Sequence, residues 1–185
     1  MKTTVKQPKW KTVEYSRTKI NKAGKTMRNE SATDYEINEA IRIIDNWRAA
    51  HAYPLHVIYM NFRRIAENRE NIVVAERLKR IESIIKKLKR EPTMSLWTMQ
   101  DLAGCRIIVP TVDDVYYYSR RYKNSRKRHI FRSENDYIMN PKESGYRSLH
   151  IIYEFHSDYS DEYNRNMLIE EEKNNFKTID YGASS

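Results

Sequence analysis

Apolar positions in the first half of the chain recur with the period of an α-helix. Thr33 and Glu36 have the spacing of a capping box, which marks the start of a helix. The apolar residues after it share one helical face: Ile37, Ala40, Ile41, Ile44 and Trp47. Pro54 suits the start of a second helix, with its own apolar face. That face holds Leu55, Ile58, Phe62 and Ile65. We expect these two helices to form an N-terminal helical hairpin.

Beyond residue 71 the apolar positions form short runs of two kinds. Clusters of β-branched and aromatic residues predict strands, at 72–79, 105–110, 128–133, 148–155 and 166–170. Helical spacing predicts two further helices at 83–91 and 111–123, the second with Thr111 as its N-cap. Because helices and strands do not alternate strictly, the pattern predicts an α+β fold with one largely antiparallel or mixed sheet.

Length and composition bound the class of protein. A chain of 185 residues with 39% hydrophobic residues can close one core rather than two. No apolar run approaches the length of a membrane span, and no apolar signal segment follows the charged N-terminus. We therefore expect a cytoplasmic protein without a membrane partner. The single cysteine, Cys105, lies in an apolar run and is expected to be buried without a chemical role.

The formal net charge of +9 is concentrated in blocks. Basic residues dominate 2–28, 77–90 and 116–132, and in the last block they alternate with aromatic residues, whereas the segment after Asp158 is acidic. Such blocks attract polyanions, either nucleotide phosphates or a nucleic-acid backbone, although a solvated basic surface has the same composition. With only four glycines the chain has no glycine-rich phosphate loop, so side chains must hold any nucleotide.

Three separate strings of residues together resemble one known family. They lie at 77–90, 99–109 and 135–155, and in this order they resemble the synthetase domain of the RelA/SpoT family. The residues before them are similar to one branch of stand-alone synthetases, so that the resemblance extends from Tyr15 to Glu170. It implies a nucleotidyltransferase-like mixed sheet of five strands, flanked by helices.

The resemblance also implies an organisation of the chain. A basic N-terminal arm at 1–30 is expected to precede a synthetase domain at 31–170. The family continues after the glutamate that Glu170 matches with a further strand and a helix, whereas residues 171–185 form a polar, acidic tail. We therefore expect the C-terminal part of the domain to be missing.

The resemblance assigns the binding of ATP to four residues. Arg77 and Lys79 match an Arg-x-Lys pair, in which the guanidinium stacks on adenine and the ammonium meets the phosphates. Ser83 and Lys87 match positions on the following helix, where a hydroxyl, free backbone N–H groups and an ammonium group converge on phosphate oxygens.

A carboxylate precedes one of the apolar strands. Taken alone, Asp101 is either a local cap or a metal ligand. The resemblance makes it a ligand of Mg²⁺, with Glu170 as the second carboxylate and both residues as the catalytic pair.

The turn at 141–150 is expected to bind the acceptor. Gly145 allows a sharp turn, and Tyr146 offers a ring on which guanine can stack, although a tyrosine that simply packs beside a turn has the same pattern. Lys142, Arg147 and His150 supply donors for phosphates or base edges, and strand alternation could turn either of the last two away.

The implied reaction is an in-line attack of a ribose 3′-oxygen on the β-phosphorus of ATP, with release of AMP. Three functions stay open: a synthetase acting on GDP or GTP, a toxin that modifies the 3′ end of tRNA, and a catalytically weak remnant that binds a nucleotide or a partner. The basic blocks favour the tRNA alternative. An antitoxin or a second copy of the chain is a possible partner.

Overall fold

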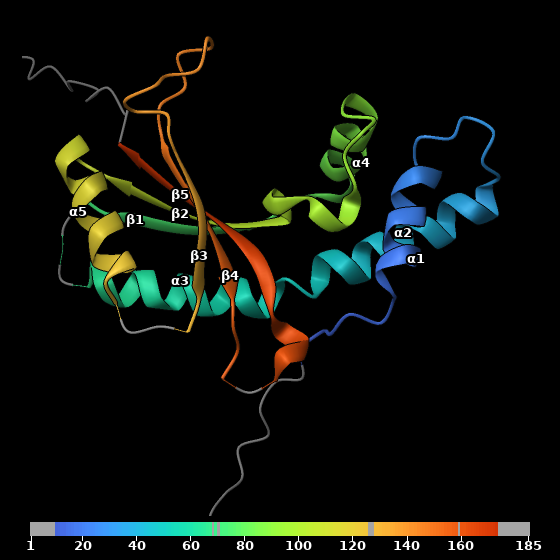
Figure 1. Cartoon of the computed structure of the whole chain (residues 1–185), viewed down its shortest axis with the longest axis horizontal. Helices are drawn as coiled ribbons and strands as arrows, with labels where there is room; N and C mark the ends of the chain where they lie inside the picture. The colour runs from blue at the N-terminus through green and yellow to red at the C-terminus, as the bar shows by residue number, and fades with distance from the viewer. Residues whose placement is uncertain (1–9, 68, 70, 126–127, 159, 174–185) are drawn as a thin grey trace, which may run out of the picture.

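The computed structural model describes residues 10–173 except 68, 70, 126–127 and 159, and for 166–173 it describes the backbone alone. Helices and strands mix along the chain (Figure 1). The helices are α1 (Arg17–Thr26), α2 (Asp34–Ala49), α3 (Ala52–Ala66), α4 (Ile81–Arg90) and α5 (Val112–Lys123), with short 3₁₀ turns η1 (Leu96–Thr98), η2 (Gln100–Leu102) and η3 (Asp161–Tyr163). The strands are β1 (Val73–Leu78), β2 (Ala103–Val109), β3 (Ile130–Asp136), β4 (Leu149–Phe155) and β5 (Arg165–Lys173).

The strands form one mixed sheet in the order β1-β2-β5-β4-β3. β2 and β5 run parallel, and every other neighbouring pair is antiparallel. This confirms the predicted α+β class and the five-stranded mixed sheet. The predicted capping box forms, since Thr33 exchanges hydrogen bonds with Glu36. Thr111 is the N-cap of α5, as predicted, and it also exchanges hydrogen bonds with Asp114.

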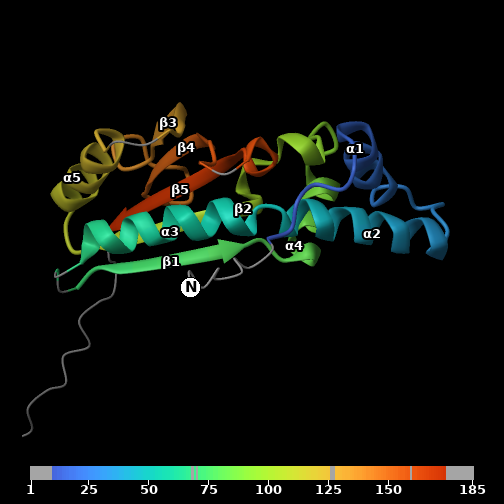
Figure 2. The same cartoon turned by 90° about the horizontal axis from the view of Figure 1, so that it is seen from below.

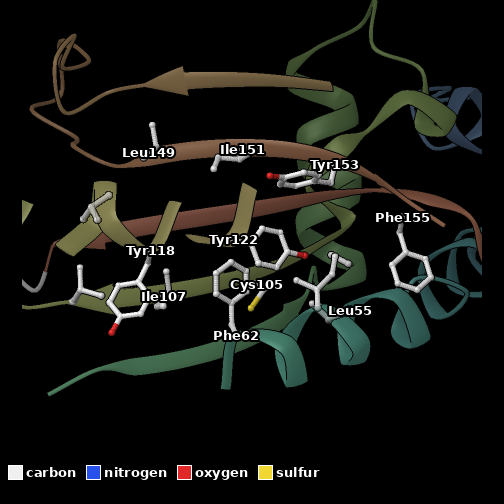
Figure 3. Close-up of a cluster of buried hydrophobic side chains, with 14 residues drawn as sticks. Leu55, Phe62, Cys105, Ile107, Tyr118, Tyr122, Leu149, Ile151, Tyr153 and Phe155 are labelled. Carbon is white, nitrogen blue, oxygen red and sulfur yellow. The ribbon is translucent and has the colours of Figure 1, made fainter. Parts of the chain in front are cut away.

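The main core lies between the sheet and the helices α3 and α5. Along β2, buried residues alternate with half-buried ones, so that Cys105 and Ile107 face the helices. Phe62 of α3 stacks on Tyr122 of α5, with ring centroids 4.3 Å apart (Figure 3). The opposite face of the sheet, which carries Gly104 and Arg106, is not covered by these helices. That face is available for a ligand.

A second apolar cluster joins α1, α2, α4 and η1. Ile20 of α1, Ile44 of α2, and Ile84 and Leu88 of α4 are all fully buried in it. Gly24 of α1 allows a close approach, because a Cβ there would lie 3.0 Å from the Cβ of Leu96. Residues 17–26 are therefore part of a folded unit rather than of a loose basic arm.

The helical hairpin has other members than the sequence predicted. α2 and α3 continue end to end along the molecule (Figure 2), and α1 is the helix that packs on α2. The expectation that α2 and α3 fold back on each other was wrong, because Ala50 and His51 at their junction keep right-handed helical dihedral angles. The chain direction therefore hardly changes there.

The last strand also differs from the prediction. β5 extends through Lys173, and Glu171, Glu172 and Lys173 have Cα partners in β2. The sequence placed these three residues in a polar tail because of their charge. Strand pairing uses backbone groups, so it tolerates charged side chains at the end of a strand.

Candidate active site

A hollow of about 350 Å³ lies on the face of the sheet that α3 and α5 leave uncovered. Its walls come from the ends of two antiparallel strands and from η2 between them. Arg77 and Lys79 extend from the end of β1, Asp101 belongs to η2, and Gly104 and Arg106 belong to β2. The backbone N–H of Lys79 donates to the carbonyl of Leu102 at 2.8 Å, which ties the two strand ends together.

Asp101 is the centre of an ion cluster in this hollow. Its Oδ2 atom lies 3.0 Å from the Nζ atom of Lys79 and 3.0 Å from the Nζ atom of Lys87. Burial opposes ionisation of Asp101, but the hydrogen bonds and positive charges of the two lysines outweigh it and hold the pKa of Asp101 below its ordinary value. Asp101 is therefore a carboxylate at neutral pH.

The other carboxylate oxygen, Oδ1, is buried and has no hydrogen-bond partner in the described part of the chain. A buried anionic oxygen without a partner is costly, and it is the type of atom that a hard cation such as Mg²⁺ binds. Among the described residues no group of three or more His, Cys, Asp or Glu side chains could hold a metal ion. A cation bound here would need Asp101 and further oxygen ligands from elsewhere.

Helix α4 brings one lysine to this cluster. Its apolar face, with Ile84 and Leu88, is buried in the second cluster, and this orients Lys87 on the neighbouring face toward Asp101. Ser83 lies in the first turn of the same helix and is half-buried. The predicted ATP-binding residues Lys79 and Lys87 thus meet, whereas Ser83 makes no hydrogen bond to this cluster.

The backbone of Glu170 lies in β5, between β2 and β4. Cα partners run across all five strands in one row: Ala75, Arg106, Glu170, His150 and Asn135. Glu170 therefore lies between Arg106, which lines the hollow, and His150. The side chain of Glu170 is outside the described residues, so its part in a metal site stays a prediction.

A cluster of aromatic rings continues this face at β4. The hydroxyl of Tyr146 lies 2.9 Å from Nε2 of His150, and the ring of Tyr137 packs edge-on to His150 with centroids 5.1 Å apart. The ammonium of Lys142 lies 4.3 Å from the ring centroid of Tyr137 and 5.4 Å from that of Tyr146. Three predicted acceptor residues are therefore brought together.

The turn before this cluster has the expected conformation. Gly145 has a φ angle of +76°, and its N–H donates to the carbonyl of Lys142 at 2.8 Å. Arg147 differs from the other predicted acceptor residues, because it is exposed and takes no part in the ring and hydrogen-bond contacts of this cluster within the described chain.

Two residues of this face were not predicted as site residues. Arg106 stands in an apolar strand, and the strict alternation of β2 turns it to the same face as Gly104. A charged residue between the apolar Cys105 and Ile107 is the signal in the sequence that could have identified it. Tyr137 has no comparable signal, because its contact with His150 depends on the pairing of β3 with β4.

Two arginines in and beside the edge strand β3 form ion pairs. Arg132 is paired with Glu154, and Arg128 lies 3.0 Å from Asp158. Asn135 itself is the Cα partner of His150. The described structure thus assigns both arginines to ion pairs away from the hollow.

No helix among the described residues has the length and apolar character required to span a membrane.

The sequence of the chain matches those of known proteins. A family model described as a region found in RelA / SpoT proteins matches residues 76–176, which is more than half of the chain. The GTP pyrophosphokinase YjbM of Bacillus subtilis (strain 168) is 40% identical over 81 residues, which cover 43% of this chain and 38% of that protein. The match thus spans about two fifths of this relative.

Solved structures share the fold. The small alarmone synthetase 1 of Bacillus subtilis, bound to its product pppGpp, superposes with a TM-score of 0.61 at 24% identity, covering 70% of this chain and 71% of that chain. The small alarmone synthetase 2 of the same organism has a TM-score of 0.60 at 28% identity, with 70% and 71% covered.

Proposed function

Because the chain belongs to the RelA/SpoT family, we propose that it is an ATP-dependent pyrophosphokinase that acts on a guanosine nucleotide. The reaction transfers pyrophosphate from ATP to the ribose 3′-hydroxyl of GDP or GTP. The observation that carries this proposal is that the ion cluster at Asp101 and the aromatic cluster at Tyr146 lie on the same face of the sheet. The ion cluster of Lys79, Lys87 and Asp101 lies on it, and the row of Cα partners leads from Arg106 to His150 beside Tyr146.

The hollow at Asp101 is the proposed ATP site. Lys79 and Lys87 provide two ammonium groups in one place, suited to the charge of a triphosphate. Arg77 and Arg106 line the same hollow from neighbouring strands, and a guanidinium plane can stack on adenine. Ser83 adds a hydroxyl in the first turn of α4, close to free backbone N–H groups.

The cluster at Tyr146 is the proposed acceptor site. The hydrogen bond between Tyr146 and His150 fixes the tyrosine ring, so that the ring presents one defined surface for a guanine base. Lys142 lies over the same rings and supplies a positive charge for the acceptor phosphates. The relative YjbM is a GTP pyrophosphokinase, and this agrees with a guanosine acceptor.

The donor set fits a magnesium ion. Asp101 would hold it through Oδ1, the oxygen that the lysines leave unpaired, and Glu170 is the proposed second ligand. A bound Mg²⁺ would neutralise charge on the triphosphate and so help an electron-rich oxygen to approach the β-phosphorus.

The protein residues mainly position the reactants. The acceptor 3′-oxygen forms a bond to the β-phosphorus while the bond from this phosphorus to the oxygen shared with the α-phosphorus breaks, and AMP leaves. Holding both nucleotides on one face of the sheet makes the attack intramolecular, and this can lower the barrier by about 7–11 kcal/mol. The lysines stabilise the charge on the transferred group.

Labelled ATP tests the proposed function. The protein is incubated with β-labelled ATP and GDP, GTP or deacylated tRNA, and label should appear on a guanosine nucleotide together with AMP. Asp101→Ala should lower this transfer by at least 100-fold while its circular dichroism spectrum stays that of the parent. Asp113→Ala, on the exposed first turn of α5, is the matched control and should keep the parent rate. Label on tRNA alone, or an unchanged rate in Asp101→Ala, would contradict the proposal.

A further inference from the structure

A second cavity lies where the start of β5 meets the junction of α2 and α3. It has a volume of about 150 Å³, and its walls include Trp47, His51, Trp97, Glu154 and Arg165. The two indole rings stack on each other with centroids 4.5 Å apart and planes 14° apart. None of the residues that line this cavity also lines the hollow at Asp101. The two sites are therefore separate.

Arg165 is the charged group of this cavity. Its guanidinium lies 5.4 Å from the ring centroid of Trp47, and its Nη1 atom donates to the carbonyl of Asn164. Its Nε and Nη2 atoms are buried and have no hydrogen-bond partner in the part of the chain that the structure describes. These two atoms form one edge of the guanidinium, the edge that binds two oxygens of one anion through parallel hydrogen bonds.

The carboxylates nearby do not occupy this edge. Glu154 lines the cavity, but its Oε2 atom accepts from Arg132 and its Oε1 atom lies 2.9 Å from Nε2 of His156. Burial lowers the pKa of Arg165 to about 10, and the charge of Glu162 offsets this only in part. Arg165 thus stays protonated at neutral pH, and two buried donors of this cation have no hydrogen-bond partner among the described residues. Such donors are costly unless a ligand accepts from them.

His51 indicates what kind of anion fits. Its Nδ1 atom lies 2.7 Å from the carbonyl oxygen of Trp47, and because a carbonyl only accepts, Nδ1 carries the proton. Burial lowers the pKa of His51 to about 4, so the ring is neutral and Nε2 is an acceptor. Monohydrogen phosphate offers oxygens to Arg165 and a hydroxyl to such an acceptor, whereas a carboxylate has no hydrogen to donate.

We propose that this cavity is a phosphate-binding site, in which the Nε and Nη2 edge of Arg165 binds one phosphate group beside the paired indoles of Trp47 and Trp97. The cavity is smaller than the roughly 300–1,000 Å³ of pockets that enclose drug-sized ligands. It therefore takes a single phosphate group, either as the free ion or as the end of a larger molecule that stays outside. This site is independent of the proposed transfer reaction.

Tryptophan fluorescence and thermal unfolding test the site with inorganic phosphate as the probe. In a Trp10→Phe background the two remaining indoles are those of the cavity. Phosphate should change their emission and raise Tm, compared with chloride at equal ionic strength. Arg165→Lys keeps the charge but loses the edge with two donors, and it should weaken the binding of phosphate at least tenfold. Arg128→Gln, at an exposed ion pair, is the matched control and should bind like the parent.

Additional measurements distinguish free phosphate from the phosphate end of a nucleotide as the ligand. They also test whether the phosphate binds in the hollow at Asp101 instead. Equal affinity for AMP would identify the end of a nucleotide as the ligand, and binding of phosphate without AMP would identify the free ion. Lys87→Ala should retain the effect of phosphate, since Lys87 lies in the other hollow. The proposal is overturned if Arg165→Lys binds phosphate like the parent, if Lys87→Ala loses the effect, or if phosphate acts no differently from chloride. Thermal unfolding without phosphate checks that each variant is folded.

Discussion

At the scale of single residues, Asp101 shows how one carboxylate can serve two purposes. Both lysines bind Oδ2, so the single carboxylate charge offsets one of the two ammonium charges, while Oδ1 is buried and has no hydrogen-bond partner in the described chain. Without the carboxylate, Lys79 and Lys87 would be two like charges held close together by β1 and α4. The same residue therefore holds the two lysines together, and in the proposed site its Oδ1 would bind the cation.

Asp101→Asn should lower the free energy of unfolding at pH 7 by about 1–3 kcal/mol, because the two ammonium groups lose their counter-charge. The pKa of Asp101 is lowered in the folded state, so its stabilising effect is complete above the ordinary value of 3.8 and is lost as the pH falls below it. Urea unfolding at pH 7 and at pH 3 measures this. A difference between parent and variant that is equally large at both pH values would contradict the ion cluster.

The ring of Tyr146, rather than its hydroxyl, is predicted to bind the acceptor. Tyr146→Phe loses only the hydrogen bond to His150 and should keep kcat within about tenfold, whereas Tyr146→Ala removes the stacking surface, worth about 1–3 kcal/mol per base. We expect the alanine variant to raise KM for GDP about tenfold or more and to leave KM for ATP unchanged. Tyr117→Ala, on the outer side of α5, is the control. Equal losses in Phe and Ala variants would assign the effect to the hydroxyl.

The site residues could be predicted from the sequence only in part. Short strings of residues carry Lys79, Lys87, Asp101 and Tyr146, and the structure brings the first three together, while their roles remain a proposal. Arg165 does not lie in any of these strings. Its unpaired donors arise because the start of β5 meets the α2–α3 junction, and no local pattern encodes that contact.

At the scale of elements, local patterns were sufficient for the position of the strands and of most helices. Capping boxes, β-branched runs and helical spacing are properties of a few neighbouring residues, and the bounds of α2, α5 and β4 follow from them. The angle between α2 and α3 could not be predicted from such local patterns. It depends on the dihedral angles of Ala50 and His51, which the buried contacts of Trp47 and His51 hold in place.

His51 makes the α2–α3 junction sensitive to acid. Burial lowers its pKa to about 4, partly offset by the hydrogen bond to Trp47, and Arg165 lowers it further. The unfolded chain takes up a proton near pH 6.5 and the folded chain only near pH 4, so stability falls as the pH decreases between these values. A shift of this size corresponds to about 3 kcal/mol. Between pH 7 and pH 4 the free energy of unfolding of the parent should fall by about 3 kcal/mol more than that of His51→Asn, as measured by urea unfolding. If the free energies of both proteins depended on pH in the same way, the prediction would be wrong.

At the scale of the whole molecule, two apolar clusters are joined at the proposed ATP site. Leu78, just before Lys79, packs against the main core, whereas Leu102, just after Asp101, and Leu88, just after Lys87, are buried in the second apolar cluster. The geometry of the site therefore depends on how the two clusters are held relative to each other. Residues of the N-terminal segment, which the sequence suggested as a cationic surface for polyanions, contribute to this arrangement through their contacts with α2 and α4.

Arg28 is the clearest example and the basis of the last prediction. Its Nε atom donates to the carbonyl of Leu88 at 2.7 Å, and Nη2 reaches the carbonyls of Glu91 and Met94, so one guanidinium caps the end of α4. Arg28→Ala should lower the free energy of unfolding by about 2–3 kcal/mol, because charged hydrogen bonds are lost and carbonyls are left without donors.

The same change should reach the active site through α4. Fraying of its last turn would loosen Lys87, so KM for ATP should rise several-fold while KM for GDP stays constant. Lys25→Ala, an equally basic residue in the last turn of α1 that makes no ion pair within the described chain, is the control for loss of charge alone. If both variants raised KM for ATP equally, the cause would be the loss of net charge. If neither variant raised it, α4 would hold its position without Arg28. A loss confined to Arg28→Ala would show that the N-terminal segment supports the ATP site through packing rather than through its charge.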